Sequence, residues 1–197
     1  MTDTLQSLPG NAANNKPVVL KGTPRNDVLH GSLGHTTFDG GLGNDIYYSK
    51  NAGDTIVEYA HEGNDTVYAD TTFTLPTHVE NLALTGNSNT FGFGNNSNNI
   101  LIGNSGNNRL SGEDGNDFLY GMGGNDTLSG GNGSDHLNGG VGDDYIAGGS
   151  GSDTIITGEG KDTVAFTASD IREGSIDRLL DLTLRRTNST YPVCIHC

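Results

Sequence analysis

The chain has 197 residues, of which 31 are glycine and none is tryptophan, and aromatic residues make up 7% of it. This composition excludes a globular core of ordinary size and favours a stack of small units in which each unit contacts its neighbours. The net charge of −14, with ten Lys and Arg residues in all, argues against binding to nucleic acid or to an anionic membrane, because both need clustered basic residues.

Residues 1–21 contain no repeated pattern, and we expect them to form a flexible N-terminus. Met1 to Pro9 lacks the basic and apolar regions of a cleaved signal peptide. Nowhere does the chain approach the run of about 18 apolar residues that a membrane-spanning helix needs. The sequence therefore predicts neither a cleaved leader nor a membrane span.

Residues 22–68 contain irregular nine-residue units that begin at Gly22, Gly31 and Gly40. The third unit is nearly complete, and an acidic residue occupies the sixth position of the first and third units, namely Asp27 and Asp45, whereas the second has Thr36 there. Two weaker units follow, with Asp54 and Asp65 at the sixth position. The extra pair Glu58-Tyr59 separates them, and we expect this insertion to disturb the stack.

Residues 69–93 connect the irregular block to a regular one. Apolar and polar residues alternate in 72–75 and again in 82–84, and Pro76 separates the two runs. This pattern predicts two short strands that continue the same stack. We also expect Phe91 and Phe93 to fill the core.

Residues 94–165 repeat every nine positions, and each unit reads Gly-Gly-x-Gly-x-Asp-x-aliphatic-x or a near variant. The eighth position is always aliphatic: Leu101, Leu110, Leu119, Leu128, Leu137, Ile146, Ile155 and Val164. The sixth position is occupied by Asn99, Asn108, Asp117, Asp126, Asp135, Asp144, Asp153 and Asp162. A disordered linker of similar composition has no reason to keep an aliphatic residue at every ninth position.

The glycines at the first, second and fourth positions predict a turn with φ > 0 before each Asp. The three residues after the Asp, such as 127–129, then form a minimal strand whose aliphatic residue points inward. One buried aliphatic side chain per nine residues falls short of the backbone entropy that folding removes. Calcium can supply the difference, because it accepts carboxylate and carbonyl oxygens at flexible geometry and neutralises repelling Asp side chains.

This unit resembles the repeats-in-toxin (RTX) nonapeptide, a known calcium-binding repeat. The resemblance covers residues 94–165 and, less regularly, 22–68. It implies an all-β fold, a right-handed parallel β-roll or β-solenoid, in which two units make one turn and residues 18 apart share a calcium ion. The pairs implied with two carboxylates in the regular block are Asp117 with Asp135, Asp126 with Asp144, Asp135 with Asp153, and Asp144 with Asp162.

Further ligands follow from the same resemblance. In the irregular block Asp27 pairs with Asp45, whereas Asp54 would face Thr36. The pairs Asn99–Asp117 and Asn108–Asp126 are expected to bind calcium more weakly, because one carboxylate is replaced by a neutral amide. We expect about four to six calcium ions, with backbone oxygens supplied by Gly115, Gly124, Gly131, Gly133, Gly140, Gly142, Gly149 and Gly151.

The C-terminal part of the chain departs from the repeat. Within residues 166–181, the run 176–181 looks like the strand that closes related rolls. The tail 182–197 is atypical of the family, and its Cys194 and Cys197 are predicted to be a chance pairing, because zinc wants four ligands and the chain has two Cys in all.

No catalytic constellation is found, so we expect a module that is not an enzyme. His61-Glu62 lacks the second His of a zinc-protease helix, and no Gly-x-Ser-x-Gly elbow occurs. The resemblance implies a secreted protein that leaves the cell through a type I apparatus and folds in extracellular calcium. The alternatives are an accessory module of a larger protease, lipase or epimerase, and an adhesin in which Tyr120 and Tyr145 contact a cell surface or carbohydrate.

Overall fold

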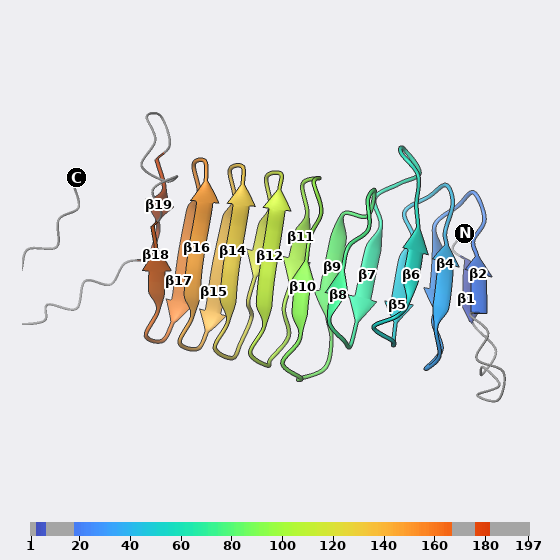
Figure 1. The fold of residues 1–197 in the computed structure, drawn as a ribbon, viewed down its shortest axis with the longest axis horizontal. Helices are drawn as coiled ribbons and strands as arrows, with labels where there is room; N and C mark the ends of the chain where they lie inside the picture. Colours follow the sequence, from blue (N-terminus) through green and yellow to red (C-terminus); the bar gives the residue numbers. More distant parts are fainter. Residues whose placement is uncertain (1–2, 7–17, 167–175, 182–197) are drawn as a thin grey trace, which may run out of the picture.

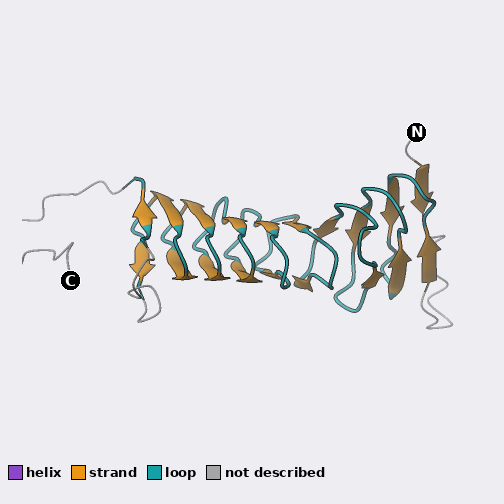
Figure 2. Cartoon of the chain, turned by 90° about the horizontal axis from the view of Figure 1, so that it is seen from above, coloured by secondary structure: helices purple, strands orange, loops and turns teal. Residues whose placement is uncertain are grey.

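The computed structural model describes residues 3–6, 18–166 and 176–181, and within these ranges the secondary structure is β-strand, without a helix. Accordingly, none of the described segments is a helix long and apolar enough to cross a membrane. The strands follow one another along an elongated stack (Figure 1). Seen from above, they form two rows that are joined by loops (Figure 2).

One face of the stack is a continuous ten-stranded sheet. Its strands, in spatial order, are β1 (Asp3–Gln6), β3 (Asp27–His30), β5 (Ile46–Ser49), β7 (Thr66–Ala69), β9 (Asn81–Leu84), β11 (Ile100–Ile102), β13 (Phe118–Tyr120), β15 (His136–Val141), β17 (Thr154–Glu159) and β19 (Arg178–Leu179).

The other face consists of two sheets. A three-stranded sheet contains β2 (Val18–Lys21), β4 (Thr36–Asp39) and β6 (Thr55–Val57). A six-stranded sheet contains β8 (Phe73–Thr74), β10 (Phe91–Phe93), β12 (Arg109–Asp114), β14 (Thr127–Asn132), β16 (Tyr145–Ser150) and β18 (Thr163–Ala165). The break between β6 and β8 follows the predicted insertion at Glu58-Tyr59.

Strands β11 to β16 each pair in parallel with the strand two units later, in a register of 18 residues. Leu119 pairs with Leu137 on one face, and Leu128 pairs with Ile146 on the other. Two nonapeptides therefore make one turn, and the fold is the parallel β-solenoid that the sequence predicts. Several strands of this block are longer than predicted: β14 and β16 each have six residues, because pairing continues past the first two glycines of the next unit.

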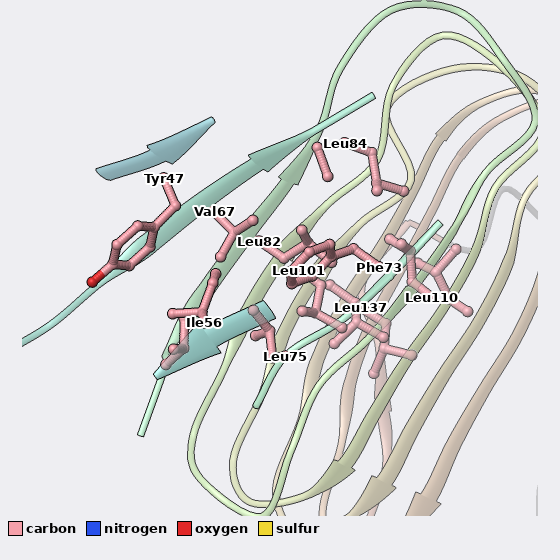
Figure 3. Close-up of a cluster of buried hydrophobic side chains, with 14 of the residues drawn as sticks. Tyr47, Ile56, Val67, Phe73, Leu75, Leu82, Leu84, Leu101, Leu110 and Leu137 are labelled. Carbon is pink, nitrogen blue, oxygen red and sulfur yellow. The ribbon is translucent and has the colours of Figure 1, made fainter. Parts of the chain in front are cut away.

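The core is the ladder of eighth-position side chains. Leu101, Leu110, Leu119 and Leu128 have no exposed surface, and the aliphatic residues of both faces belong to one buried cluster. Figure 3 shows this cluster where the two blocks meet, with Leu82, Leu101 and Leu110 among the labelled side chains. Strand alternation sends the polar residues on either side of each aliphatic residue outward, so the core is one side chain thick per strand.

The expectation that Phe91 and Phe93 fill the core is wrong. Phe91 is 46% exposed, and the residue that faces inward on β10 is Gly92, which pairs with Phe73 and Leu110. A Cβ on Gly92 would touch the side chains of Leu82 and Leu110, so these leucines already fill the space that a side chain there would need. The 18-residue register fixes which residue of β10 faces inward, and Phe91 and Phe93 therefore point outward.

The stack also extends further toward the N-terminus than the sequence predicts. Strands β1 and β2 lie within residues 1–21, for which a flexible terminus is expected, and they pair with β3 and β4. Val18 pairs with Thr36 at the usual spacing of 18 residues. The short aliphatic run Val18-Val19-Leu20 was the signal for this strand.

Candidate metal sites

The sixth-position side chains form two ladders, one along each edge of the stack. In each step, a backbone N–H donates to the carboxylate of the residue 18 positions later: Asp117 N lies 2.8 Å from Asp135 Oδ1, and Asp126 N lies 2.7 Å from Asp144 Oδ1. The same bond joins Asp27 to Asp45, Asn99 to Asp117, Asn108 to Asp126, Asp135 to Asp153 and Asp144 to Asp162. The structure thus brings the predicted pairs together, while their role as ligands stays a prediction.

In four of these carboxylates the second oxygen has no hydrogen-bond partner among the described residues. These are the buried Oδ2 atoms of Asp117, Asp126, Asp135 and Asp144. In the described part of the chain, none of the four residues forms an ion pair with Lys or Arg. A buried charged oxygen without a partner is costly, so its natural complement is a bound cation or a proton.

The first-position glycines allow these oxygens to approach the backbone closely. A Cβ on Gly130 would collide with Asp135 Oδ2 and with the carbonyl oxygen of Gly148, and the same holds for Gly112 and Gly121 with their own partners. These glycines do not have positive φ values, so the prediction that they need φ > 0 is wrong. Glycine is required there because two oxygens approach its Cα closely. The carboxylate oxygen and the carbonyl oxygen of a neighbouring turn thus lie side by side at these glycines.

The glycines at the second and fourth positions do take the predicted left-handed conformation. All eight candidate glycines have φ between 103° and 140° or close to it: Gly115, Gly124, Gly131, Gly133, Gly140, Gly142, Gly149 and Gly151. Four second positions of the regular block lack glycine: Glu113 and Met122 adopt φ of 79° and 76°, whereas Asn95 and Asn104 do not have positive φ. The turn thus imposes the left-handed backbone on Glu113 and Met122 but not on the two asparagines. Whether the glycine carbonyls bind an ion stays a prediction.

Burial raises the pKa of the carboxyl groups in the ladders. It raises the pKa of Asp117 to about 6 and the pKa of Asp126 and Asp135 to about 7. The backbone N–H that each carboxylate accepts lowers its pKa, and neighbouring carboxylates raise it. The calcium-free fold therefore disfavours the ionised form of these groups, which a cation would restore. An all-oxygen donor set of this kind suits a hard cation such as Ca²⁺.

Asparagine replaces this arrangement in the first two regular units. The amide nitrogen of Asn108 donates to the carbonyl oxygen of Thr90 at 3.2 Å and to Asn104 Oδ1 at 3.1 Å, while its oxygen accepts the N–H of Asn104 at 2.7 Å. Asn99 makes equivalent bonds with the carbonyls of Val79 and Glu80. Both ends of each amide are satisfied by the protein, so these units hold together through their own hydrogen bonds.

In the irregular block, some carboxylates are satisfied by hydrogen bonds within the protein and others keep a buried oxygen without a partner. Asp54 is fully satisfied: Oδ1 accepts the N–H of Thr36, and Oδ2 accepts from Ser49, Lys50 and Asn51. Asp27 is partly satisfied, because Thr23 donates to its Oδ2 through both N–H and hydroxyl, while its Oδ1 is buried without a partner.

Asp45 and Asp65 are carboxylates that each keep a buried oxygen without a partner. The N–H of Asp45 donates to Asp65 Oδ1 at 2.7 Å, although the two residues are 20 positions apart, and the Oδ2 atoms of both are buried and unpartnered. The sequence reasoning paired Asp45 with Asp27 alone. It also missed Glu58, whose carboxylate is buried beside this pair. The signal for both is the two-residue insertion, which keeps Asp65 on the ladder at a spacing of 20.

The fifth position forms a second ladder that the sequence analysis did not identify. The Asn98 Oδ1 atom accepts the N–H of Asn116, and Asn116 Oδ1 accepts the N–H of Ser134. Asn107 and Asn125 continue the pattern on the other edge. The signal was asparagine at the same position of successive units. These bonds join neighbouring turns without any need for a cation.

The C-terminal run 176–181 closes the stack as predicted. Strand β19 pairs with β17, and Asp177 accepts the N–H of Asp153 at 3.0 Å, as a sixth-position Asp would. Asp181 accepts the N–H groups of Thr157 and Gly158. The tail 182–197, with Cys194 and Cys197, lies outside the described residues.

Comparison with known proteins agrees with this geometry. Residues 19–56, 93–128 and 129–164, together more than half of the chain, match the sequence model of the RTX calcium-binding nonapeptide repeat. One relative is the endo-1,3-1,4-beta-glycanase ExsH of Rhizobium meliloti (strain 1021), which is 44% identical over 77 residues; these cover 39% of this chain and 16% of that protein. The chain thus spans a small part of that relative, and by its matching repeats it belongs to the RTX calcium-binding nonapeptide repeat family.

Proposed function

We propose that this chain is the calcium-binding β-roll module of a secreted RTX protein and that it folds when it meets calcium outside the cell. The observation that carries the proposal is the set of buried, unpartnered Oδ2 atoms of Asp117, Asp126, Asp135 and Asp144. Each lies close to a first-position glycine and to the backbone carbonyl oxygen of a neighbouring turn. Without a cation these charges oppose folding, and with one they join successive turns, so ion binding and folding are coupled.

The proposed ions number about four to six. Four lie between the paired carboxylates of the regular block, where the chain continues the ladder through Asp153 and Asp162. The irregular block contributes the remainder through Asp27, Asp45 and Asp65. The two units that contain Asn99 and Asn108 need no ion in this proposal. Their amide nitrogens donate to the surrounding backbone carbonyl oxygens, which are therefore satisfied without a cation.

Export supports the same proposal. RTX proteins are generally secreted, and free calcium is low inside cells and high outside them. A chain whose buried carboxylates require calcium would remain unfolded until it leaves the cell. We infer export through a type I apparatus from family membership, and we infer that the module itself performs no catalysis, its carboxylates being committed to the two ladders.

A carbohydrate-binding surface is the second candidate. A groove of about 290 Å³ crosses the fifth-position ladder and is lined by Asn64, Asn98, Asn116 and Phe118, among others. Amides beside an exposed aromatic ring can contact a sugar, and the relative ExsH is a glycanase by name. A glycan array with Phe118→Ala as the control variant tests this candidate: glycan binding that the variant loses supports it, and absence of binding rejects it.

The main proposal is tested by a calcium titration monitored by far-UV circular dichroism. The expected result is a cooperative change from coil to β-sheet with calcium and no such change with magnesium, which demands a smaller and more regular site. A spectrum that is already rich in β-sheet in chelator, and that calcium leaves unchanged, would reject folding by calcium. Secretion is tested separately, by whether co-expression with a type I apparatus moves the chain into the medium.

A further inference from the structure

The insertion in the irregular block places a third carboxylate against the ladder. Ile46 pairs with Thr66 at a spacing of 20 residues, two more than in the regular block. Glu58, the first residue of the inserted pair, follows β6 directly and is 8% exposed. A Glu is almost never buried to this degree unless it is paired or binds a metal. Its position therefore requires a partner.

Glu58 lies beside the two ladder carboxylates of this turn. Carboxylate oxygens of Asp45, Glu58 and Asp65 all lie within 4.8 Å of one another, and all three residues are buried. Tyr47 donates its hydroxyl hydrogen to Glu58 Oε1. One oxygen of each carboxylate remains buried without any hydrogen-bond partner: Asp45 Oδ2, Glu58 Oε2 and Asp65 Oδ2.

The oxygens of the cluster pack closely against Gly40. A Cβ there would collide with Tyr47 Oη, Asp45 Oδ2 and Glu58 Oε1, so these oxygens occupy the position that a side chain would need. Among the described residues, no Lys or Arg forms an ion pair with any of the three carboxylates. Burial raises the pKa of Asp45 to about 6, of Asp65 to about 7 and of Glu58 to about 8. The three charges thus have hydrogen-bond donors but no cationic side chain of the described chain beside them.

We propose that Asp45, Glu58 and Asp65 form a calcium site whose third carboxylate comes from outside the nonapeptide pattern. This proposal adds a site to the proposed function and rests on it only in that both bind calcium. Three carboxylates give a higher charge than the pair in a regular turn, and charge count is one way in which proteins tune calcium affinity. Because of its three negative charges, the site would bind a trivalent lanthanide ion more tightly than calcium.

The ion would join the insertion to the stack where one sheet is interrupted. Strand β6 ends at Val57, directly before Glu58, and the sheet on that face resumes at β8. An ion held by Glu58 together with Asp45 and Asp65 would fix the loop after β6 against the continuous ten-stranded sheet. The site would thus hold the irregular block in line with the regular one.

Tyr47 provides a reporter for this site. Its ring lies at the edge of the aliphatic cluster with the hydroxyl pointing away from that cluster (Figure 3), and the hydroxyl binds Glu58. Terbium bound there would be excited through the tyrosine ring. The chain has seven tyrosines and no tryptophan, so the signal of this site is the part of the terbium luminescence that Tyr47→Phe removes.

The test is a terbium titration of the full chain, repeated with calcium as competitor. Glu58→Gln keeps the size of the side chain and removes its charge; it is expected to weaken the Tyr47-dependent terbium binding by about tenfold or more. Asp114→Asn, which removes an exposed carboxylate outside the sixth-position ladders, is the matched control and is expected to change that binding less than about twofold. Unchanged binding in Glu58→Gln would overturn the proposal.

Gly40→Ala provides a second test in case Glu58→Gln does not fold. It retains all three carboxylates but displaces Tyr47 Oη and Asp45 Oδ2, with which the added Cβ would collide. The Tyr47-dependent signal is therefore expected to disappear, and a wild-type titration would overturn the proposal. The two proposals fail separately. Calcium-independent circular dichroism with an intact Tyr47-dependent signal rejects the folding switch alone, whereas the reverse result rejects this site alone.

Discussion

The variant Asp135→Asn tests whether the Asp135 carboxylate is a calcium ligand or only a structural side chain. Asp135 lies between two steps of the ladder: its Oδ1 accepts the N–H of Asp117, and its own N–H donates to Asp153. It therefore borders two proposed ions, and the amide removes one charge from both sites. In calcium, we expect the substitution to destabilise the fold. In chelator, we expect it to increase β-sheet content, because it removes a buried charge whose Oδ2 atom has no partner among the described residues.

The size of the effect follows from ligand linkage. At a free calcium concentration of about 100 times Kd, each ion contributes about 2.7 kcal/mol, and a site weakened about tenfold contributes about 1.4 kcal/mol at the same concentration. Two weakened sites therefore lose about 2.6 kcal/mol in total. The assay is urea unfolding at fixed free calcium, followed by far-UV circular dichroism, with the calcium-free spectrum recorded for both proteins.

Asp54→Asn is the matched control. Its carboxylate accepts hydrogen bonds from Thr36, Ser49, Lys50 and Asn51, so it needs no ion. We expect this variant to lose about 1–3 kcal/mol for a disrupted hydrogen-bonded carboxylate, by the same amount with and without calcium. If Asp135→Asn behaves like Asp54→Asn, with equal losses in calcium and chelator, the assignment of the ladder carboxylates as calcium ligands is refuted.

Three further predictions concern the core, the amide-bonded units and pH. Leu128→Ala, which truncates a fully buried side chain, is expected to cost about 2–5 kcal/mol in urea unfolding with calcium present, whereas a loss below about 1 kcal/mol would mean that the ladder is not the core. Asn108→Asp is expected to raise the number of bound calcium ions by one in native mass spectrometry. An unchanged number would contradict the claim that the hydrogen bonds of the Asn108 amide replace a calcium ion. Burial raises the pKa of Asp126 from 3.8 to about 7, so the calcium-free fold should lose stability as pH rises from about 4 to 7. By contrast, the calcium needed for folding should increase as pH falls through the same window, because protons compete with the ion; a titration midpoint independent of pH would contradict this.

The regular block could be predicted from sequence because its pattern and its structure have the same period. An aliphatic residue every ninth position and an Asp two positions earlier suffice to place Leu128 in the core and Asp126 beside Asp144. The turn glycines were predictable for the same reason, since φ > 0 strongly favours glycine. What the pattern could not give is the reason for the first-position glycine, which depends on two oxygens from different turns approaching one Cα.

The irregular block was harder to predict because its spacing changes. Glu58 is seven residues from Asp65 and thirteen from Asp45, and the nonapeptide pattern assigns it no place. It joins the two carboxylates only when the insertion brings the chain back onto the stack. The prediction that Phe91 fills the core failed for a related reason. Its apolar character predicted burial, but the register with Leu110 turns Gly92 inward instead. In both cases long-range pairing, which local pattern does not contain, decided the outcome.

The most direct test of the calcium assignment is an anomalous-difference map from crystals grown in calcium. Peaks are expected beside Oδ2 of Asp117, Asp126, Asp135 and Asp144, close to the first-position glycines. None is expected beside the amide of Asn108, whose hydrogen bonds are complete. An ordered stack without peaks at the four Asp side chains, or with equal peaks at the amide, would contradict the claim that calcium is the missing partner of these carboxylates.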